Sequence, residues 1–268
     1  MTFVSRVRAE TTAAALGFLR RRTAVFFTFF FPVIIILIFG ALVQTNPTGG
    51  GLFSEPPVYY LPAYIGVVVL FTPLSRVGSE VARHRDDNRF EKLATTPLRR
   101  WEWLLAQTAV NVAIIGAAAL VIFALVVFVS GAQVAVGPEL LALVPFVALA
   151  VTLFCGVGAI LGSVAGSQDG VIAAANGIAI PLLFLSETFV TPEQLPDWFV
   201  PVLDLSPLTY FSRGVREVTT PQMAAYADGG ILVQHGPAVA PWLLNLVVLT
   251  VLAVAFFAVG AFALPRTD

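Results

Sequence analysis

The chain has 268 residues, of which 58% are hydrophobic and only 12% are charged. Soluble domains carry about twice that charged fraction, so the composition excludes a water-soluble fold and predicts an integral membrane protein. The net charge of −1 gives no indication of a polyanionic partner, and we expect no nucleic-acid partner.

Six uncharged runs are long enough to cross the hydrocarbon core, which takes roughly 20 apolar residues in a helix. The runs are apolar on every face rather than alternating, which favours helices over barrel strands. We therefore predict an all-α integral membrane protein whose single transmembrane domain covers residues 1–268. The expected spans are residues 23–43, 58–75, 103–129, 140–164, 171–190 and 241–264.

The segment before the first span has a weakly amphipathic pattern. Phe3, Val7, Ala14 and Phe18 fall near one helical face. This predicts an interfacial helix that lies along the membrane surface, with a solvated tail as the alternative. The first apolar run is too long and too far from the start for a cleaved signal peptide, so we expect none.

The loop between the second and third spans carries an apolar pattern among its charges. Phe90, Leu93 and Ala94 are spaced i, i+3 and i+4, which predicts a short helix with Phe90 and Leu93 on an exposed apolar face. Thr96 followed by Pro97 is typical of a helix start, so we expect the third span to begin there. The alternative is an ordinary solvated connector.

Small and polar residues inside the later spans predict helix packing. Gly158, Gly162 and Gly166 recur every four residues, which allows two helices to approach closely. Asn111 and Asn176 are the main deep polar groups, and we interpret them as interhelical hydrogen-bonding residues. Charges at depth that would mark an ion path are almost absent, because Glu187 is expected near an outer helix end.

Between the fifth and sixth spans, two helix starts are expected. Thr191-Pro192-Glu193-Gln194 combines an N-cap, a proline at the first helical position and a capping-box glutamine. Ser206-Pro207 offers the second start. The segment therefore predicts an outer hairpin of two short helices, at about residues 192–203 and 207–219.

The basic residues predict the orientation in the membrane. Of the 15 Lys and Arg residues, 13 fall in the N-terminal segment, the second loop and the C-terminal end, and only Arg213 and Arg216 fall on the other side. Cytoplasmic loops carry the basic excess. We expect a multi-pass cell membrane protein with both termini cytoplasmic.

The residues needed for several kinds of chemistry are missing from the sequence. The one lysine, Lys92, is followed by Leu93, so the chain holds no Gly-Lys-Ser/Thr phosphate loop. With one cysteine and two distant histidines, His84 and His235, no compact His/Cys metal cluster is expected. We predict no catalytic residues and no metal ligands.

Two stretches carry a resemblance to a known family. Glu91-Lys-Leu-Ala-Thr-Thr-Pro-Leu-Arg resembles the cytoplasmic loop of the type-2 ABC transporter permeases. The stretch from Leu183 through Leu-Pro-Asp-Trp to Leu205-Ser-Pro-Leu-Thr-Tyr is similar to the outer segment of the same family. The chain departs from the family pattern at Asn88-Arg89-Phe90, at Ser206, and at Glu187-Thr188, where a glycine is common.

The resemblance implies two functional regions. A coupling helix that contacts a separate ATPase subunit would comprise Phe90, Glu91, Lys92, Leu93, Thr96 and Pro97. An outer hairpin that dips into the outer leaflet and helps to close the exit would comprise Pro192, Leu195, Pro196, Trp198, Pro207, Tyr210, Arg213 and Arg216. A membrane-resting cap without a gating role is the alternative for the hairpin.

The predicted function is that of a transmembrane subunit of an ATP-driven ABC exporter, which forms the substrate pathway and is not itself an enzyme. The resemblance implies an ABC ATPase subunit as partner, a second permease chain in a homodimer or heterodimer, and the lipid bilayer as surroundings. ATP would be bound by the partner subunit, so this chain needs no cofactor. The alternatives are an ion-coupled secondary transporter and an intramembrane enzyme.

Overall fold

The computed structural model describes residues 2–38, 57–130, 134–135, 137–189, 195–221 and 240–265, and every regular element in these ranges is a helix. The long α-helices are α1 (Phe3–Leu19), α2 (Arg22–Leu37), α3 (Leu61–Asp86), α5 (Arg100–Ser130), α6 (Leu143–Val164), α7 (Gln168–Phe184), α9 (Pro207–Thr219) and α12 (Pro241–Ala263). The shorter elements are α4 (Arg89–Ala94), α8 (Val200–Leu203) and the 3-10 turns η2 (Pro57–Tyr60) and η3 (Pro138–Ala142).

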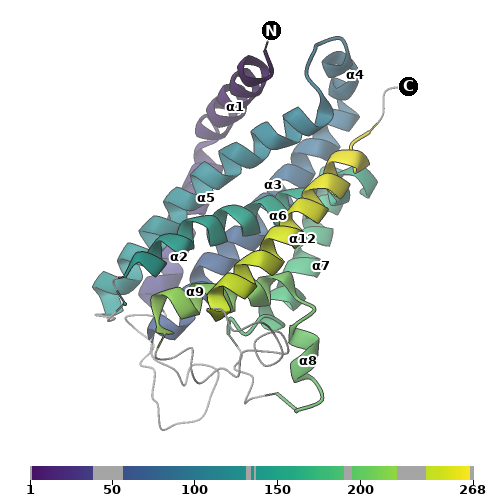
Figure 1. The fold of residues 1–268 in the computed structure, drawn as a ribbon. Coiled ribbons are helices and arrows are strands. Elements are labelled where there is room, and N and C mark those ends of the chain that lie inside the picture. The colour runs from purple at the N-terminus through teal and green to yellow at the C-terminus, as the bar shows by residue number, and fades with distance from the viewer. Residues whose placement is uncertain are drawn as a thin grey trace.

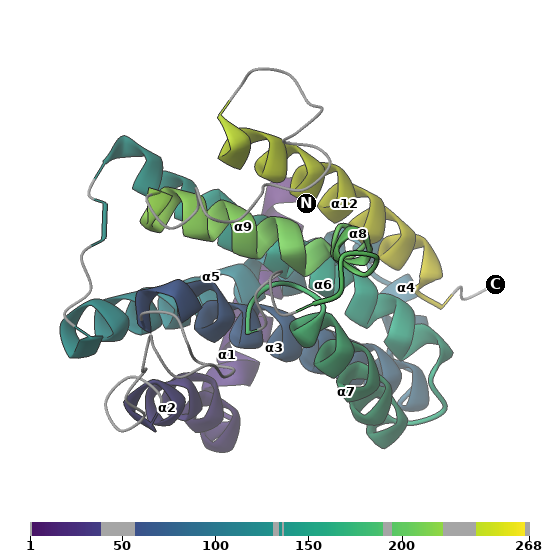
Figure 2. The same cartoon turned by 90° about the horizontal axis from the view of Figure 1, so that it is seen from below.

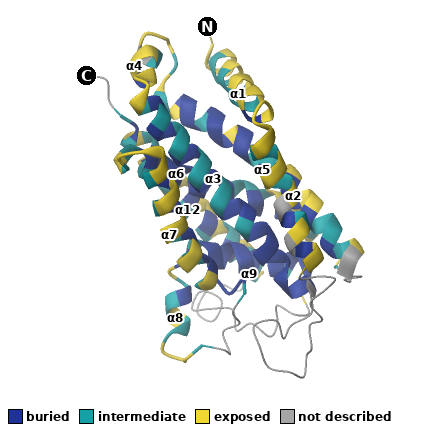
Figure 3. Cartoon of the chain, turned by 180° about the vertical axis from the view of Figure 1, so that it is seen from behind, coloured by how far each residue is buried: buried dark blue, intermediate teal, exposed yellow. Residues whose placement is uncertain are grey.

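The helices form an elongated bundle with distinct ends (Figure 1). The start of α1, the short helix α4 and the end of α12 lie at one end, whereas α8 and α9 lie at the other. Viewed along the bundle, α3 and α6 lie in the middle and the remaining helices surround them (Figure 2). Burial follows the same arrangement, because α3 and α6 are largely buried while α1, α4 and α7 show exposed faces (Figure 3).

Four helical segments in the described residues are long and apolar enough to cross a membrane: Val58–Asp86, Arg100–Phe128, Pro138–Val164 and Pro241–Ala263. They correspond to the second, third, fourth and sixth expected spans. The helices at the first and fifth expected positions, Arg22–Ile34 and Gln168–Phe184, are shorter. The far end of the first expected span lies outside the described residues.

The second helix is longer than its apolar run. Residues 58–75 were the expected span, but α3 continues to Asp86. Glu80 pairs with both Arg83 and His84 one turn later, and Arg83, His84 and Arg85 lie in the last turn, where positive charge complements the helix dipole. A helix therefore continues through the charged segment, since local pairing on one side adds to the burial of Val77, Val81 and Ala82 on the other.

The fifth helix is shorter than expected, ending at Phe184 rather than at 190. The hydroxyls of Ser186 and Thr188 both donate to the carbonyl oxygen of Leu183, at 2.8 and 2.5 Å. These side chains satisfy a carbonyl that the helix leaves without an amide partner. The chain turns here instead of continuing as a helix.

Glycine packing joins the central helices. A Cβ atom added to Gly158 would lie 2.8 Å from the carbonyl oxygen of Leu74 on α3, and one added to Gly162 would meet the carbonyl oxygen of Gly78. The predicted close approach is therefore confirmed for Gly158 and Gly162. It is wrong for Gly166, which lies beyond the end of α6 and has open space around it.

Candidate functional site

The short helix α4 joins α3 to α5 at the end of the bundle where α1 begins (Figure 1). Asn88 precedes it in the left-handed conformation, with φ of 52°, which asparagine tolerates better than most residues. The hydroxyls of Thr95 and Thr96 donate to the carbonyl oxygens of Lys92 and Leu93, at 2.8 and 2.7 Å. The left-handed backbone of Asn88 thus marks the start of α4, and local hydrogen bonds mark its end.

Phe90 faces the chain's own core, contrary to the expectation of an exposed apolar face. Its ring centroid lies 5.5 Å from the rings of both His84 and Trp103, and its exposed fraction is 7%. The reason is that α3 and α5 flank α4 and supply apolar surface within the same chain. Leu93 is half-buried, whereas Glu91 and Lys92 are exposed, so the face available to a partner is charged.

The third span starts later than the Thr96-Pro97 pair predicted. Thr96 lies just after α4, Pro97 is exposed in the connector, and α5 begins at Arg100. Glu102 accepts a hydrogen bond from the backbone amide of Arg99 at 3.0 Å, which satisfies one of the free donors at the helix start. The same carboxylate accepts from Nε of Arg6 on α1 at 3.0 Å. Glu102 therefore links α1 to α5.

A cavity of about 300 Å³ lies beside α4. Its lining includes Phe90, Leu93, Leu98 and Trp103, together with Pro265 just after α12. The guanidinium of Arg100 donates to the carbonyl oxygen of Leu264 at 3.0 Å, which holds the end of α12 near the start of α5. Three separate parts of the chain thus meet behind α4.

At the opposite end, the predicted hairpin residues have different environments. Pro192 lies outside the described residues. Leu195 is half-buried, Pro196 and Trp198 are exposed, and Pro207 occupies the first turn of α9. The described part of the first expected helix contains only α8, whereas the second matches α9, residues 207–219, in full.

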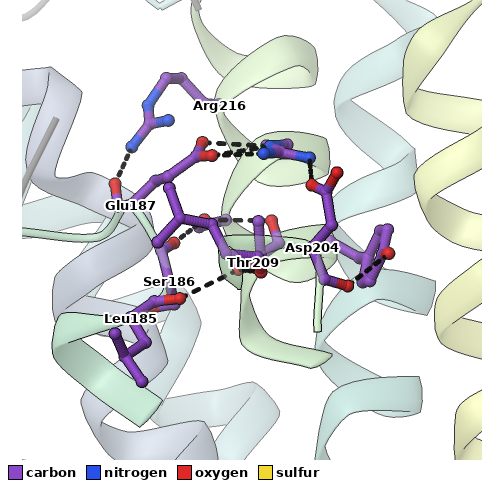
Figure 4. Close-up of polar contacts among 10 residues, drawn as sticks. Leu185, Ser186, Glu187, Asp204, Thr209 and Arg216 are labelled. Carbon is purple, nitrogen blue, oxygen red and sulfur yellow. Dashed lines mark hydrogen bonds and ion pairs between the residues drawn. The ribbon is translucent and has the colours of Figure 1, made fainter. Parts of the chain in front are cut away.

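The buried members of this hairpin form an ion-pair network (Figure 4). Nε of Arg213 donates to the carboxylate oxygens of Glu187 at 3.0 and 3.1 Å, and its Nη1 donates to Asp204 at 2.5 Å. Nη2 of Arg216 donates to the backbone oxygen of Glu187 at 2.7 Å. The Arg216 guanidinium also lies over the ring of Tyr59, 4.0 Å from its centroid. The network therefore ties the turn after α7 to α9 and η2.

Glu187 holds the centre of the network and was missed by the sequence analysis as an ion-pair partner. It is 1% exposed and has a φ of 55°, a conformation that favours glycine. The signal in the sequence was the departure from the family pattern at Glu187, where a glycine is common. Its carboxylate forms a buried salt bridge with Arg213, which supplies the opposite charge that a buried carboxylate requires.

Several hydroxyl groups complete the packing around the network. Ser212 donates to the backbone oxygen of Ser186 at 2.6 Å, and Thr209 donates to that of Leu203 at 2.6 Å. Tyr210, which is 8% exposed, donates to the backbone oxygen of Asp204 at 2.6 Å. These hydrogen bonds hold α9 across the end of the bundle, against the turns at 185–188 and 203–206 (Figure 2).

Burial changes the acid–base behaviour of α9. Burial alone would lower the pKa of Arg213, but hydrogen bonds and charge interactions with Glu187 and Asp204 raise it above its ordinary value. Burial raises the pKa of Glu217 on the same helix to about 7. The network thus holds Arg213 as a cation, while Glu217 titrates near neutral pH.

Comparison with known proteins places the chain in a family. The family model of the ABC-2 type transporters matches residues 6–219, which includes most of α1 and all of α4 and α9. The chain is also similar to the daunorubicin resistance ABC transporter permease protein DrrB1 of Streptomyces coeruleorubidus, with 35% identity over 60 residues. That match covers 22% of this chain and 21% of the relative. Because the family match extends over most of the sequence, the chain belongs to the ABC-2 type transporter family.

Proposed function

We propose that this chain is the transmembrane subunit of an ATP-driven exporter, in which a separate ATPase subunit binds and hydrolyses ATP. Membership of the ABC-2 type transporter family supports the division into permease and ATPase. The lone lysine, in Lys92-Leu93, supports it as well, because a phosphate loop requires Gly-Lys-Ser/Thr. The permease acts as a dimer, with a second copy or a related chain completing the substrate pathway.

In this proposal α2 and α7 cross the membrane with the four longer helices, giving six spans. Both termini and α4 face the cytoplasm, since 13 of the 15 basic residues fall on that side. The proximity of the α1 start, α4 and the end of α12 supports this topology, because all three lie at one end of the bundle (Figure 1).

The position and anchoring of α4 carry the proposal. Its outward residues Glu91 and Lys92 are exposed for contact with an ATPase, while Phe90 inserts between α3 and α5 against His84 and Trp103. A helix fixed in this way transmits a push from the ATPase to two long helices at once. A solvated connector has no need of such an aromatic anchor.

At the other end, α9 and its ion-pair network would close the outer exit of the pathway. Support comes from the salt bridge between Glu187 and Arg213, which are both buried. This pair links α9 to the turn that follows α7. The exposed Trp198 suits the membrane interface, where its ring and its N–H find different surroundings.

Charge reversal on α4 tests the docking. Glu91→Lys is expected to reduce co-purification with the ATPase subunit by about tenfold, equivalent to about 1.4 kcal/mol. The matched control is Glu139→Lys, which reverses an exposed carboxylate in η3, at the start of α6. Phe90→Ala should retain the ATPase but lose the coupling of ATP hydrolysis to transport, because it loosens the anchor and leaves the exposed face intact.

Equal recovery of the ATPase with Glu91→Lys and with the Glu139→Lys control would contradict docking at α4. ATP hydrolysis by the purified chain alone, tracking a single size-exclusion peak, would contradict the division of labour.

A further inference from the structure

A cavity of about 620 Å³ lies between α1, the start of α2 and the charged half of α3. Its wall combines two kinds of side chain. Phe18, Phe27 and Phe71 are apolar, whereas Glu10, Arg21, Arg76, Glu80, Arg83 and Arg89 are charged. Its size falls within the range of small-molecule sites. An apolar wall that ends in charged groups suits an amphiphile rather than a sugar or an ion.

Most of the cations around the cavity already have a carboxylate. Arg21 lies 3.6 Å from Glu80, and Arg83 pairs with the same side chain. Arg89 pairs with Asp87 at 3.2 Å. Each of these three arginines thus has a carboxylate partner within the chain, and Arg21 and Arg83 share Glu80.

Arg76 is different. In the described part of the chain, its Nη1 donates to the side-chain oxygen of Asn111 at 3.4 Å, and no carboxylate lies within ion-pair distance. Its guanidinium lies over the ring of Phe18, 4.6 Å from the centroid. An amide and an aromatic face orient a guanidinium without neutralising it. Arg76 therefore presents to the cavity a positive charge that no carboxylate of the described residues contacts directly.

The position of Arg76 along α3 suits contact with a lipid phosphate. The preceding residues of α3, 61–75, are uncharged, and the following turns hold Glu80, Arg83 and His84. Arg76 thus lies where the apolar part of the helix ends. A planar guanidinium with several N–H donors binds phosphate oxygens in pairs, so it fits this group better than a single point charge does.

We propose that this cavity binds an anionic phospholipid of the adjacent membrane leaflet, with its phosphate on Arg76 and an acyl chain along Phe18, Phe27 and Phe71. The bound lipid connects α1 to α3 and fills space that protein side chains leave open. At Gly17, in the cavity wall, an added Cβ atom would meet nothing within 4 Å. The proposal requires only a membrane around the chain and is independent of ATP coupling.

The test uses the purified, delipidated full-length chain in detergent. Phosphatidylglycerol, phosphatidylcholine and inorganic phosphate are added separately in graded amounts, and bound lipid is counted by native mass spectrometry beside the thermal midpoint. We expect saturable binding of phosphatidylglycerol with an increase in the midpoint, and neither effect from phosphate alone. Arg76→Gln, which keeps a hydrogen-bonding amide, should weaken this binding on the order of tenfold.

Two further variants test whether a loss of phosphatidylglycerol binding is specific to the cavity. Arg8→Gln removes the same charge from an exposed position on α1 that does not line the cavity, and should bind like the parent. Gly17→Leu should reduce binding by occupying the cavity, and it favours the helical state of α1, so it remains informative if Arg76→Gln does not fold.

Three outcomes would overturn the proposal. These are unchanged phosphatidylglycerol binding in both Arg76→Gln and Gly17→Leu, equal affinity for phosphatidylcholine, and equal stabilisation by inorganic phosphate. The last would identify a soluble phosphate compound as the ligand in place of a lipid.

Discussion

Arg213 has an exposed fraction of only 8% and contacts two carboxylates, which makes it the side chain most dependent on its partners at the α9 end. Charged groups are costly to bury unless they are paired and hydrogen-bonded. Glu187, at 1% exposure, has Arg213 as its compensating charge among the described residues. The Glu187–Arg213 pair, between residues 26 positions apart, is therefore expected to contribute strongly to the stability of this end.

Replacing Arg213 with methionine should destabilise the chain strongly. The change keeps most of the side-chain volume but leaves Glu187 charged and buried, at a cost of about 3–5 kcal/mol. Thermal unfolding in detergent measures the effect. Arg89→Met is the matched control, because Arg89 and Asp87 form an exposed pair, for which about 0–1 kcal/mol is expected. Similar losses in both variants would show that the network does not stabilise the fold.

Glu217 should make stability depend on pH. Burial raises its pKa from the ordinary 4.5 to about 7, so between these values the folded chain holds a proton that the unfolded chain releases. Stability contributed by this group is therefore present at pH 5 and lost as the pH rises through 7. Glu217→Gln should raise the thermal midpoint at pH 8 and change it little at pH 5. A shift of equal size at both pH values would contradict the assignment, and Glu139→Gln serves as an exposed control.

Phe90 shows what the sequence could and could not provide at this scale. Its spacing with Leu93 correctly indicated a short helix with an apolar face. The pattern held no information on which surface would cover that face, because Trp103 and His84 approach it only through the tertiary arrangement of α3 and α5. The Glu187–Arg213 pair was equally hidden, since pairing across 26 residues leaves no periodic signal.

Among the elements, those whose ends are marked by composition were predicted best. The helix at 207–219 and the sixth span at 241–264 agree with α9 and α12 to within one residue, because a proline opens each of them. The prediction for the second span ended eleven residues too early, because the apolar run ends at Ser75 whereas the helix continues to Asp86. Apolar runs define where lipid can lie, but hydrogen bonds and charge pairs define where a helix ends.

Packing of α6 against α3 predicts opposite effects for two glycine substitutions. Gly158→Ala would place a methyl group 2.8 Å from the carbonyl oxygen of Leu74, and this overpacking should cost about 1–3 kcal/mol. Gly177→Ala on α7 meets nothing within 4 Å and should be neutral or stabilising by about 0.5–1 kcal/mol. Thermal unfolding of both variants checks this, and tolerance of Gly158→Ala would mean that the two helices are less closely packed than described.

For the whole molecule, the distribution of basic residues predicts the orientation in the membrane, which can be tested directly. In a Cys155→Ala background, cysteines are introduced singly at Lys92 and Pro138, which lie in α4 and η3. An impermeant thiol reagent added to intact cells should label position 138 rapidly and position 92 only after permeabilisation. Rapid labelling at position 92 in intact cells would show that the topology is the reverse of the predicted one. In that case α4 would lie outside the cell, where it could not contact the ATPase.

The glycine contacts on both sides of α6 have a mechanical consequence. A Cβ atom on Gly158 would approach α3, and one on Gly260 would lie 2.6 Å from the carbonyl oxygen of Gly156, so α6 meets both α3 and α12 almost backbone to backbone. If α6 slid along either neighbour, a side chain larger than that of glycine would meet a backbone carbonyl oxygen at the contact. The three helices are therefore expected to move as one rigid body in the proposed transport cycle, with any opening at their contacts with the other helices.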